Sequence, residues 1–187
     1  MSMKLRRAVW VRSRIIAVLL AIVLASTVTS CGRSPSPTAA LKQYLGASGS
    51  GVEVYPQRIS LGDNYYTYFA DQGSQPVAAV AYYANDHWTV TAYGSIPKVT
   101  GCTKDAWMGT VNFAYSPTHP KRLLLAGRLV GVPGHAEVIY SSGDQTKTIK
   151  VLNGGFWALN MPSVNNGGVF SLQVRNENGK IVPTCIF

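Results

Sequence analysis

Short β-rich runs separated by turn sequences are the feature that most constrains the fold of this chain. Helical periodicity disappears from Pro97 onward. Seven β-rich runs recur there, at residues 109–115, 123–130, 135–140, 146–151, 156–160, 169–175 and 181–186. The segments between them, such as "GVPG" and "NENGK", are rich in residues that favour turns. Strands at this spacing predict a C-terminal seven-stranded β-sandwich over residues 98–187.

Three stretches of this region resemble a known type of domain. They are "LLLAGRLVGVPGHAEVIY", "KVLNGGFWALN" and "GGVFSLQVRNENGK". Together they look like a small immunoglobulin-like or transthyretin-like domain covering residues 105–187, with a Gly-marked turn before an aromatic strand and a final hairpin. The chain departs from the immunoglobulin pattern around Trp157, because Cys102 precedes the first strand and Cys185 lies on the last. A bridge between these cysteines is therefore expected to clamp the first and last strands and not to cross the core.

Residues 39–97 predict a second, smaller α+β domain. Thr38 can cap a short helix over residues 39–45 that Gly46 ends. Strand-like runs follow, the first interrupted by Pro56, and the clearest hairpin joins residues 77–84 to 87–93 through Asn85-Asp86, a pair that tolerates turn conformations. The region is thus predicted to be a helix leading into an antiparallel meander. The whole mature chain is predicted to be mainly β with one short helix.

The segment before residue 31 has the pattern of a bacterial export signal, which predicts a signal peptide over residues 1–30. Basic side chains come first, with no acidic residue among them, and residues 15–25 form the unbroken apolar run "IIAVLLAIVLA". That order is typical of a signal peptide. Eleven residues at about 1.5 Å each reach only about half of a hydrocarbon core roughly 30 Å thick. A permanent transmembrane helix is therefore the weaker interpretation.

Val28-Thr29-Ser30-Cys31 resembles a bacterial lipobox, in which an aliphatic residue and two small ones precede a cysteine. The resemblance implies that Cys31 is lipidated and becomes the first residue of the mature protein. Residues 31–38 are predicted to form an extended tether, since Ser and Pro favour solvated, extended backbone. The alternative left open is an ordinary secretory peptide with an incidental cysteine.

The charge of the chain changes when the leader is removed. The full chain has 17 basic and 8 acidic residues, and five of the basic ones precede residue 31. The mature part therefore keeps 12 basic residues against 8 acidic ones, a net charge of +4. No basic cluster is longer than Lys121-Arg122. We predict no nucleic-acid partner, and a weakly basic surface suited to anionic lipid or wall polymer.

Cys102 and Cys185 remain once the lipobox cysteine is assigned. Outside the cytoplasm, two remaining thiols are most simply interpreted as a disulfide. The alternative makes Cys102 a nucleophile with His119 as its base. Nothing in the local sequence "TGCTKDAW" marks an activated thiol, so the disulfide is the preferred prediction.

The remaining titratable residues indicate no catalytic or metal site. Three histidines occupy a turn, a proline-flanked loop and a strand start, with no spacing typical of a metal site: His87, His119 and His135. Four aspartates lie in turn-like contexts, where they can bond nearby backbone amides: Asp63, Asp71, Asp86 and Asp105. The sequence contains no GxSxG, HExxH or phosphate-binding glycine loop of the kinds that carry catalysis. We predict no catalytic residue, no metal and no cofactor.

Aromatic residues are concentrated in the N-terminal meander. Within 29 residues the sequence has Tyr65, Tyr66, Tyr68, Phe69, Tyr82, Tyr83, Trp88 and Tyr93. Because a strand alternates its side chains, one set can fill a core while another stays exposed and binds sugar rings or a partner protein. The residues predicted for such a binding face are Tyr66, Tyr68, Tyr82 and Tyr93. The alternative is that a thin sheet with one helix uses all these rings as core.

These features predict a bacterial cell-envelope lipoprotein, anchored by lipid to the extracytoplasmic face of a membrane. It is expected to act as a binding or scaffolding module and not as an enzyme. Its expected partners are the membrane, through the lipid anchor, and a cell-wall polymer or an envelope protein. The competing hypothesis is an extracytoplasmic hydrolase that uses Cys102 or a histidine.

Overall fold

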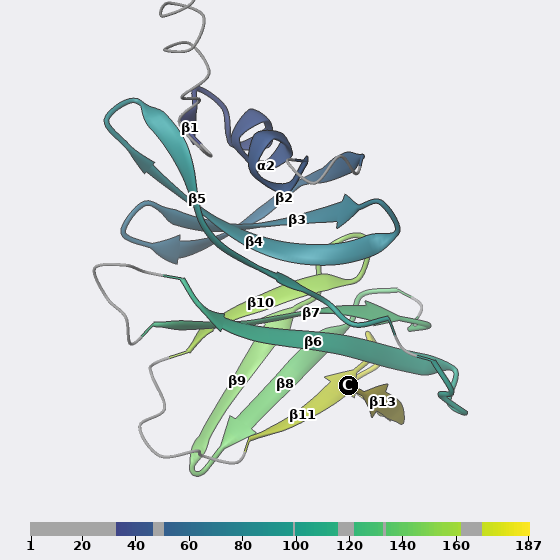
Figure 1. Cartoon of the computed structure of the whole chain (residues 1–187). Helices are drawn as coiled ribbons and strands as arrows, with labels where there is room; N and C mark the ends of the chain where they lie inside the picture. Colours follow the sequence, from purple (N-terminus) through teal and green to yellow (C-terminus); the bar gives the residue numbers. More distant parts are fainter. Residues whose placement is uncertain (1–32, 47–50, 99, 116–121, 133, 162–169) are drawn as a thin grey trace, which may run out of the picture. The chain divides into compact units, whose positions relative to one another are not determined.

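The computed structural model describes residues 33–46, 51–98, 100–115, 122–132, 134–161 and 170–187. The predicted signal peptide, Cys31 and His119 lie outside the described residues. Those that are described belong to one compact unit, Gly32–Phe187. It is mainly β, with a single α-helix among the described residues and several antiparallel sheets, which confirms the predicted class (Figure 1).

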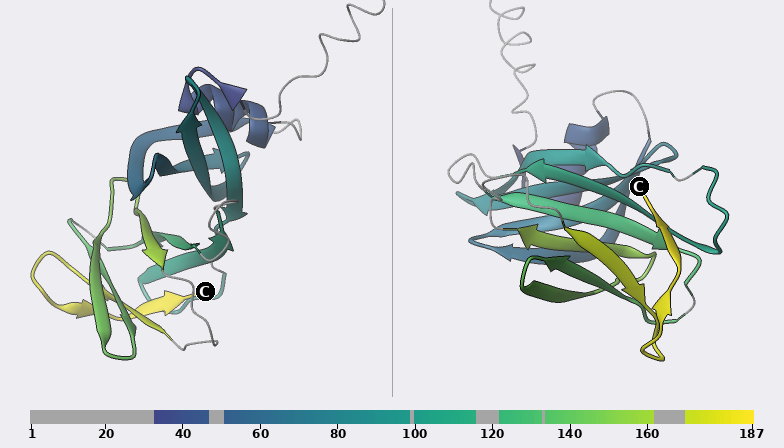
Figure 2. Two further views of the ribbon diagram at one scale, coloured as in Figure 1. Left: turned by 90° about the vertical axis from the view of Figure 1, so that its left-hand side faces the viewer. Right: turned by 90° about the horizontal axis from the view of Figure 1, so that it is seen from below.

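The described residues of this unit form three sheets. The N-terminal sheet has the order β1(Arg33–Ser34), β5(His87–Ser95), β4(Gln75–Ala84), β3(Tyr65–Gln72), β2(Val52–Gly62). The middle sheet has the order β10(Phe156–Met161), β7(Leu123–Val130), β6(Ala106–Ala114), β13(Thr184–Ile186). The C-terminal sheet has the order β12(Ile181–Val182), β11(Ser171–Arg175), β8(Glu137–Ser142), β9(Gln145–Lys150). Helix α2(Pro37–Leu45) and the three sheets follow one another as layers (Figures 1 and 2).

Helix α2 begins two residues earlier than the sequence predicts, and Ser36 is its cap instead of Thr38. The Ser36 side chain accepts a hydrogen bond from the Ala39 amide at 3.1 Å, and Pro37 opens the helix, where its missing amide costs nothing. Gly46 ends the helix as predicted. The helix buries Ala40, Leu41 and Leu45 against the N-terminal sheet. No helix among the described residues combines the length and the apolar content needed to cross a bilayer.

Part of the predicted tether over residues 31–38 is described, and residues 33–38 contain a strand and the start of the helix. Arg33 and Ser34 form β1, which pairs antiparallel with β5 in the register Arg33 with Thr89 and Ser34 with Trp88. Helix α2 starts at Pro37. In an isolated Ser/Pro segment the backbone N–H and C=O groups would hydrogen-bond to water. Here pairing with β5 and the N-cap at Ser36 give some of these groups partners within the protein. Regular structure is therefore present already at residues 33–34.

The hairpin at Asn85-Asp86 is confirmed. Ala84 pairs with His87, and the two turn residues have φ values of 50° and 62°, the left-handed conformation of a type I′ turn. Pro56 does not end its strand as expected. It lies within β2, at the edge of the sheet, where the register shifts between Val54 and Arg58. An edge position and a bulge are the places where a strand tolerates a residue without an N–H group.

The middle sheet is buried on both faces. Leu124 and Ala126 of β7 belong to a core cluster shared with the N-terminal sheet, which includes Phe69 and Val80. Leu125 and Leu129 of the same strand pack instead against Val138 and other residues of the C-terminal sheet. Burial on both faces explains why the sequence "LLLA" shows no alternation of polar and apolar residues. The division into domains 39–97 and 98–187 stays a prediction, and side chains from both segments share one core.

The last run of the predicted sandwich, residues 181–186, is two strands instead of one. Ile181–Val182 pairs with β11 in the C-terminal sheet, whereas Thr184–Ile186 pairs parallel with β6 in the middle sheet. Pro183 lies between them and has no amide hydrogen to continue a ladder. The chain therefore changes sheets at this proline.

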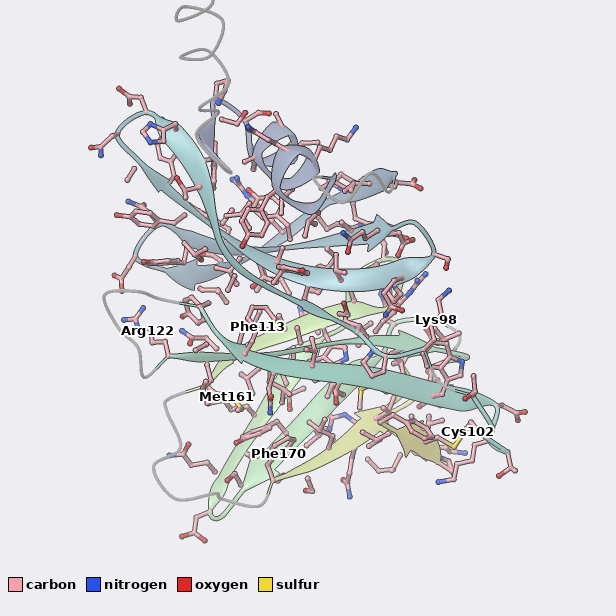
Figure 3. All side chains as sticks on the ribbon, in the orientation of Figure 1. Lys98, Cys102, Phe113, Arg122, Met161 and Phe170 are labelled. Atoms are coloured by element: carbon pink, nitrogen blue, oxygen red, sulfur yellow. A yellow bond between two sulfur atoms is a disulfide. The ribbon has the colours of Figure 1, made fainter. Side chains whose placement is uncertain are left out.

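Cys102 and Cys185 form a disulfide, as predicted, with their Cα atoms 6.0 Å apart. Cys185 lies on β13, and Cys102 precedes β6, the strand with which β13 pairs. Figure 3 labels Cys102 and shows the sulfur–sulfur bond. The bridge fastens the end of the chain to the start of the middle sheet.

Candidate functional site

An aromatic cluster centred on Trp88 lies on the face of the N-terminal sheet that also carries helix α2. The ring centroid of Trp88 is 5.5 Å from that of Tyr66, 6.1 Å from Tyr68 and 5.1 Å from Tyr83. Arg58 completes the group, with its guanidinium carbon 4.7 Å from the Tyr66 ring centroid. We call Arg58, Tyr66, Tyr68, Tyr83 and Trp88 the Trp88 cluster.

The register of the strands brings these residues together. Tyr83 of β4 lies directly opposite Trp88 of β5, because the two-residue turn at Asn85-Asp86 fixes that pair. Arg58 of β2 lies opposite Tyr68 of β3. Neighbouring strands thus place a cation and four rings on one face.

Burial differs within the Trp88 cluster. Tyr68 and Trp88 are 4% and 9% exposed, whereas Tyr83 is 38% exposed, Tyr66 is half-buried and Arg58 is exposed. The inner rings therefore support the fold, while the outer ring and the cation meet solvent.

Arg58 stays charged in this setting. Its Nη1 donates a hydrogen bond to the Tyr68 hydroxyl at 3.4 Å, and this bond raises the pKa of Arg58. Burial raises the pKa of Tyr68, which opposes ionisation of the phenol. A permanent positive charge over an aromatic face suits ligands that combine apolar surface with negative charge.

The four tyrosines of the predicted binding face do not share one exposed surface. Tyr66 and Tyr68 lie in the Trp88 cluster, and Tyr68 is buried. Tyr82 lies on the opposite face of the sheet, because it pairs with Tyr65 across β3 and β4 and stacks on that ring at 4.6 Å. Tyr93 is 45% exposed and lies edge-to-face with Tyr44 of α2 at 5.9 Å. Whether any of them binds a ligand stays a prediction.

Sequence reasoning missed Tyr83 and Trp88 as members of this site. The signal was present, since the Asn85-Asp86 turn pairs residue 84 with 87 and therefore 83 with 88. The pairing around the turn at Asp63-Asn64, whose φ values are 50° and 63°, could not be counted from the sequence in this way. The register there shifts between Ser60 and Gly62.

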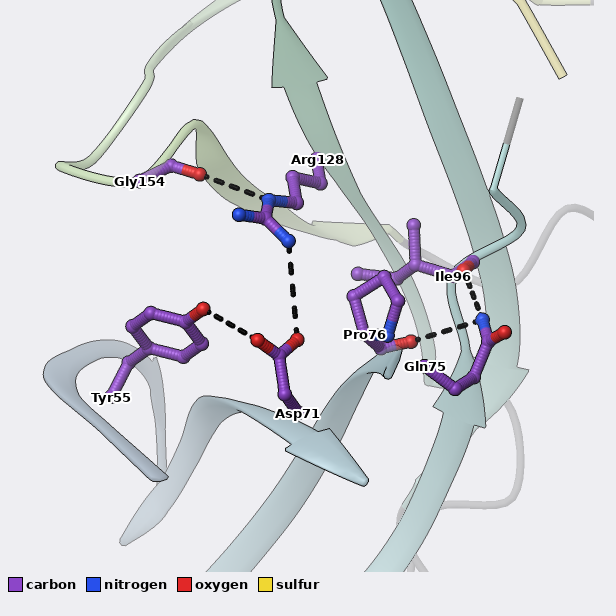
Figure 4. Close-up of polar contacts among 7 residues, drawn as sticks. All are labelled: Tyr55, Asp71, Gln75, Pro76, Ile96, Arg128 and Gly154. Carbon is purple, nitrogen blue, oxygen red and sulfur yellow. Dashed lines mark hydrogen bonds and ion pairs between the residues drawn. The ribbon is translucent and has the colours of Figure 1, made fainter. Parts of the chain in front are cut away.

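A second polar cluster joins the N-terminal and middle sheets (Figure 4). The Tyr55 hydroxyl donates to Asp71 Oδ2 at 2.7 Å, and Arg128 Nη1 lies 3.9 Å from Asp71 Oδ1, an ion pair too long for a hydrogen bond. Arg128 Nε also donates to the Gly154 carbonyl at 3.2 Å. Asp71 thus lies on β3 with a partner across the sheets, and not in the turn expected for it.

This second cluster has a structural explanation. Burial, followed by the hydrogen bond to Asp71, raises the pKa of Tyr55, so the phenol remains a donor at neutral pH. The Arg128 guanidinium carbon also lies 5.0 Å from the Phe156 ring centroid. Tyr55 and Asp71 belong to the N-terminal sheet and Arg128 to the middle sheet, so the ion pair of Arg128 with Asp71 fits a contact that holds two layers together.

The structure bears on part of the alternative enzyme hypothesis, since His119 lies outside the described residues. Cys102 is bonded to Cys185, so it supplies no thiolate, and the thiol-nucleophile alternative is corrected. His87 Nδ1 lies 2.6 Å from the Asn85 carbonyl in its turn, and His135 is exposed near the start of β8. Within the described ranges, no three His, Cys, Asp or Glu side chains are grouped where they could hold a metal ion.

No protein-family model matches the sequence, and neither the curated proteins nor the solved structures contain a match to this chain.

Proposed function

We propose that this protein is a bacterial cell-envelope lipoprotein, anchored through a lipidated Cys31 and acting by binding or scaffolding on the extracytoplasmic face of a membrane. The observation that carries the proposal is the sequence pattern before residue 32, where a basic segment and an apolar run lead to Val28-Thr29-Ser30-Cys31.

The disulfide supports the same compartment. Disulfides form and persist outside the cytoplasm, where thiols are not kept reduced. Cys102 and Cys185 are separated by 83 residues in sequence, and their bond links β13 to the segment that precedes β6, the strand with which β13 pairs. A protein that needs this bond is suited to an exported location.

The C-terminal region is proposed to be an immunoglobulin-like sandwich with one departure. The order β10-β7-β6 in one sheet and β12-β11-β8-β9 in the other is the order expected for the strands of such a domain when the last strand is divided between the sheets. This architecture commonly serves binding and scaffolding. A cell-wall polymer or an envelope protein is the proposed partner.

Replacing Cys31 with Ser tests the anchoring directly. The variant should leave the membrane fraction while its melting temperature matches that of the wild-type soluble domain. Retention of Cys31→Ser in the membrane would contradict lipid anchoring and favour an uncleaved signal anchor. Capture of partners from native envelopes, with wild type and Cys31→Ser compared, then separates partners that need the anchor from those that bind the fold.

A further inference from the structure

We propose that the Trp88 cluster and the adjoining edge of β5 lie at the bilayer surface and contact anionic phospholipid headgroups. The inference deepens the proposed function and rests on the lipidation of Cys31. It assigns the aromatic surface of the N-terminal sheet to the membrane and leaves the C-terminal sheet facing away from it.

The covalent structure of the chain limits how far this edge can move from the anchor. Ser34 pairs with Trp88, and Arg33 pairs with Thr89, so the first described residues are fixed to β5. One residue, Gly32, separates Arg33 from Cys31. Two residue steps span at most about 7 Å. A lipid held by Cys31 therefore keeps β5 near the membrane surface, without a long linker that would let the domain move away.

The exposed side chains near this edge suit a headgroup region. Tyr83 is 38% exposed and Tyr93 is 45% exposed, and both belong to the N-terminal sheet. Tyr and Trp rings favour the interface between hydrocarbon and water, because one end is apolar and the other forms hydrogen bonds. Exposed tyrosine rings close to a membrane anchor are therefore suited to the interface between hydrocarbon and water.

The charged groups fit an anionic lipid surface. Arg58 is exposed beside Tyr66, and Lys42 is exposed on α2, the helix packed on the same face of the sheet. Basic groups next to a membrane are attracted to anionic lipid. Asp63, in the turn between β2 and β3, is already paired with Arg122 at 2.8 Å, whereas Asp86 is an exposed acid at the end of the β4–β5 hairpin.

A comparable exposed apolar group elsewhere supplies a matched control. Phe187 is 51% exposed and follows β13, in the middle sheet. It therefore follows a strand of a different sheet from the one that contains β1, the strand next to Cys31 in sequence. A membrane contact that depends on the anchor should involve Tyr83 and Arg58 and leave Phe187 free.

Fluorescence quenching in vesicles tests the proposal. The acylated mature protein is reconstituted in equal parts of phosphatidylcholine and phosphatidylglycerol, with and without a nitroxide on the lipid headgroup. The mature chain has Trp88, Trp107 and Trp157, so subtracting the spectrum of Trp88→Phe isolates the Trp88 emission. Loss of most of that emission with nitroxide lipid is expected. Arg58→Gln and Tyr83→Ser should each weaken the quenching, and Phe187→Ser should not.

The outcomes separate this inference from the proposed function. Intact mass of the same sample shows whether Cys31 carries acyl chains. An acylated protein whose Trp88 emission is unaffected by nitroxide lipid would overturn the membrane-facing assignment while leaving the lipoprotein proposal in place. A crosslink from Tyr83 to an envelope protein, with Trp88 still unquenched, would assign the face to a protein partner and also overturn it. A protein without acyl chains would remove the proposed function itself, and the inference with it.

Discussion

Phe69 and Phe156 stack with their ring centroids 4.7 Å apart and an interplanar angle of 20°, although they come from strands on opposite sides of residue 97. Phe69 lies on β3 of the N-terminal sheet and Phe156 on β10 of the middle sheet. Tyr55 approaches the same Phe156 ring at 4.7 Å. The pair therefore ties two layers of the fold into one core.

Replacing Phe156 with Ala should lower the free energy of unfolding by about 3–5 kcal/mol, the usual loss for a buried aromatic truncation. Urea unfolding should remain a single transition when followed both by tryptophan emission and by far-ultraviolet circular dichroism, because the N-terminal and middle sheets share this core. Phe156→Leu is the control, since it keeps an apolar side chain and should cost less. Two separated transitions in the wild type would contradict a shared core.

Tyr68 and Tyr93 should respond differently to substitution. Tyr68→Ser should cost roughly 3 kcal/mol or more, because the ring is buried against Trp88 and its removal leaves a cavity. Tyr93→Ser should change stability by no more than about 0.5 kcal/mol, since that ring is nearly half exposed. Thermal melts of the two variants measure this difference in stability. Equal losses would mean that the burial described for Tyr68 is wrong.

Stability should fall at alkaline pH. Burial raises the pKa of Tyr55, Tyr68 and Tyr115 above their ordinary value of 10.0. Above that value the unfolded chain loses phenol protons that the folded protein keeps, so the free energy of unfolding decreases as the pH rises through the folded-state pKa values. The stabilisation is complete below pH 10.0 and is lost above it.

Urea titrations at a series of pH values around and above 10 measure this loss. Tyr68→Phe, which cannot ionise at that position, should show a smaller decrease than wild type. Absorbance of phenolate gives an independent readout, because buried tyrosines should ionise only as the protein unfolds. Ionisation of all ten tyrosines in one step near their ordinary pKa, with no loss of structure, would contradict the prediction.

Removing the disulfide should destabilise the protein by about 4 to 5 kcal/mol on chain-entropy grounds, since the bond closes a separation of 83 residues. The double variant Cys102→Ser with Cys185→Ser isolates this effect from thiol chemistry. Hydrogen exchange should show the largest loss of protection at β13 and at its partner β6. Unchanged stability and exchange would mean that the bond does not constrain the folded protein.

The fold was predictable where local chemistry decides it. The strands of the C-terminal region, the Asn85-Asp86 turn and the end of α2 at Gly46 follow from turn residues and capping groups that act over a few positions. The cysteine pair was also predictable, because the assignment of Cys31 to the lipobox left Cys102 and Cys185 as the two remaining cysteines.

The parts that failed depend on contacts far apart in sequence. Pairing of residues 33–34 with β5 turned a predicted tether into structure. Which face of a sheet Tyr82 occupies was settled by its register with Tyr65, and the sequence does not show that both faces are covered. The role of Asp71 emerged only because Tyr55 approaches it across the same sheet and Arg128 approaches it from the middle sheet.

The intact mass of the protein isolated from native membranes tests the central claim most directly. We predict a chain that begins at Cys31, carries acyl chains on that residue, and reacts with iodoacetamide at Cys102 and Cys185 only after reduction. A mass that retains residues 1–30, or a chain that begins at residue 31 without acylation, would contradict a lipid-anchored envelope protein.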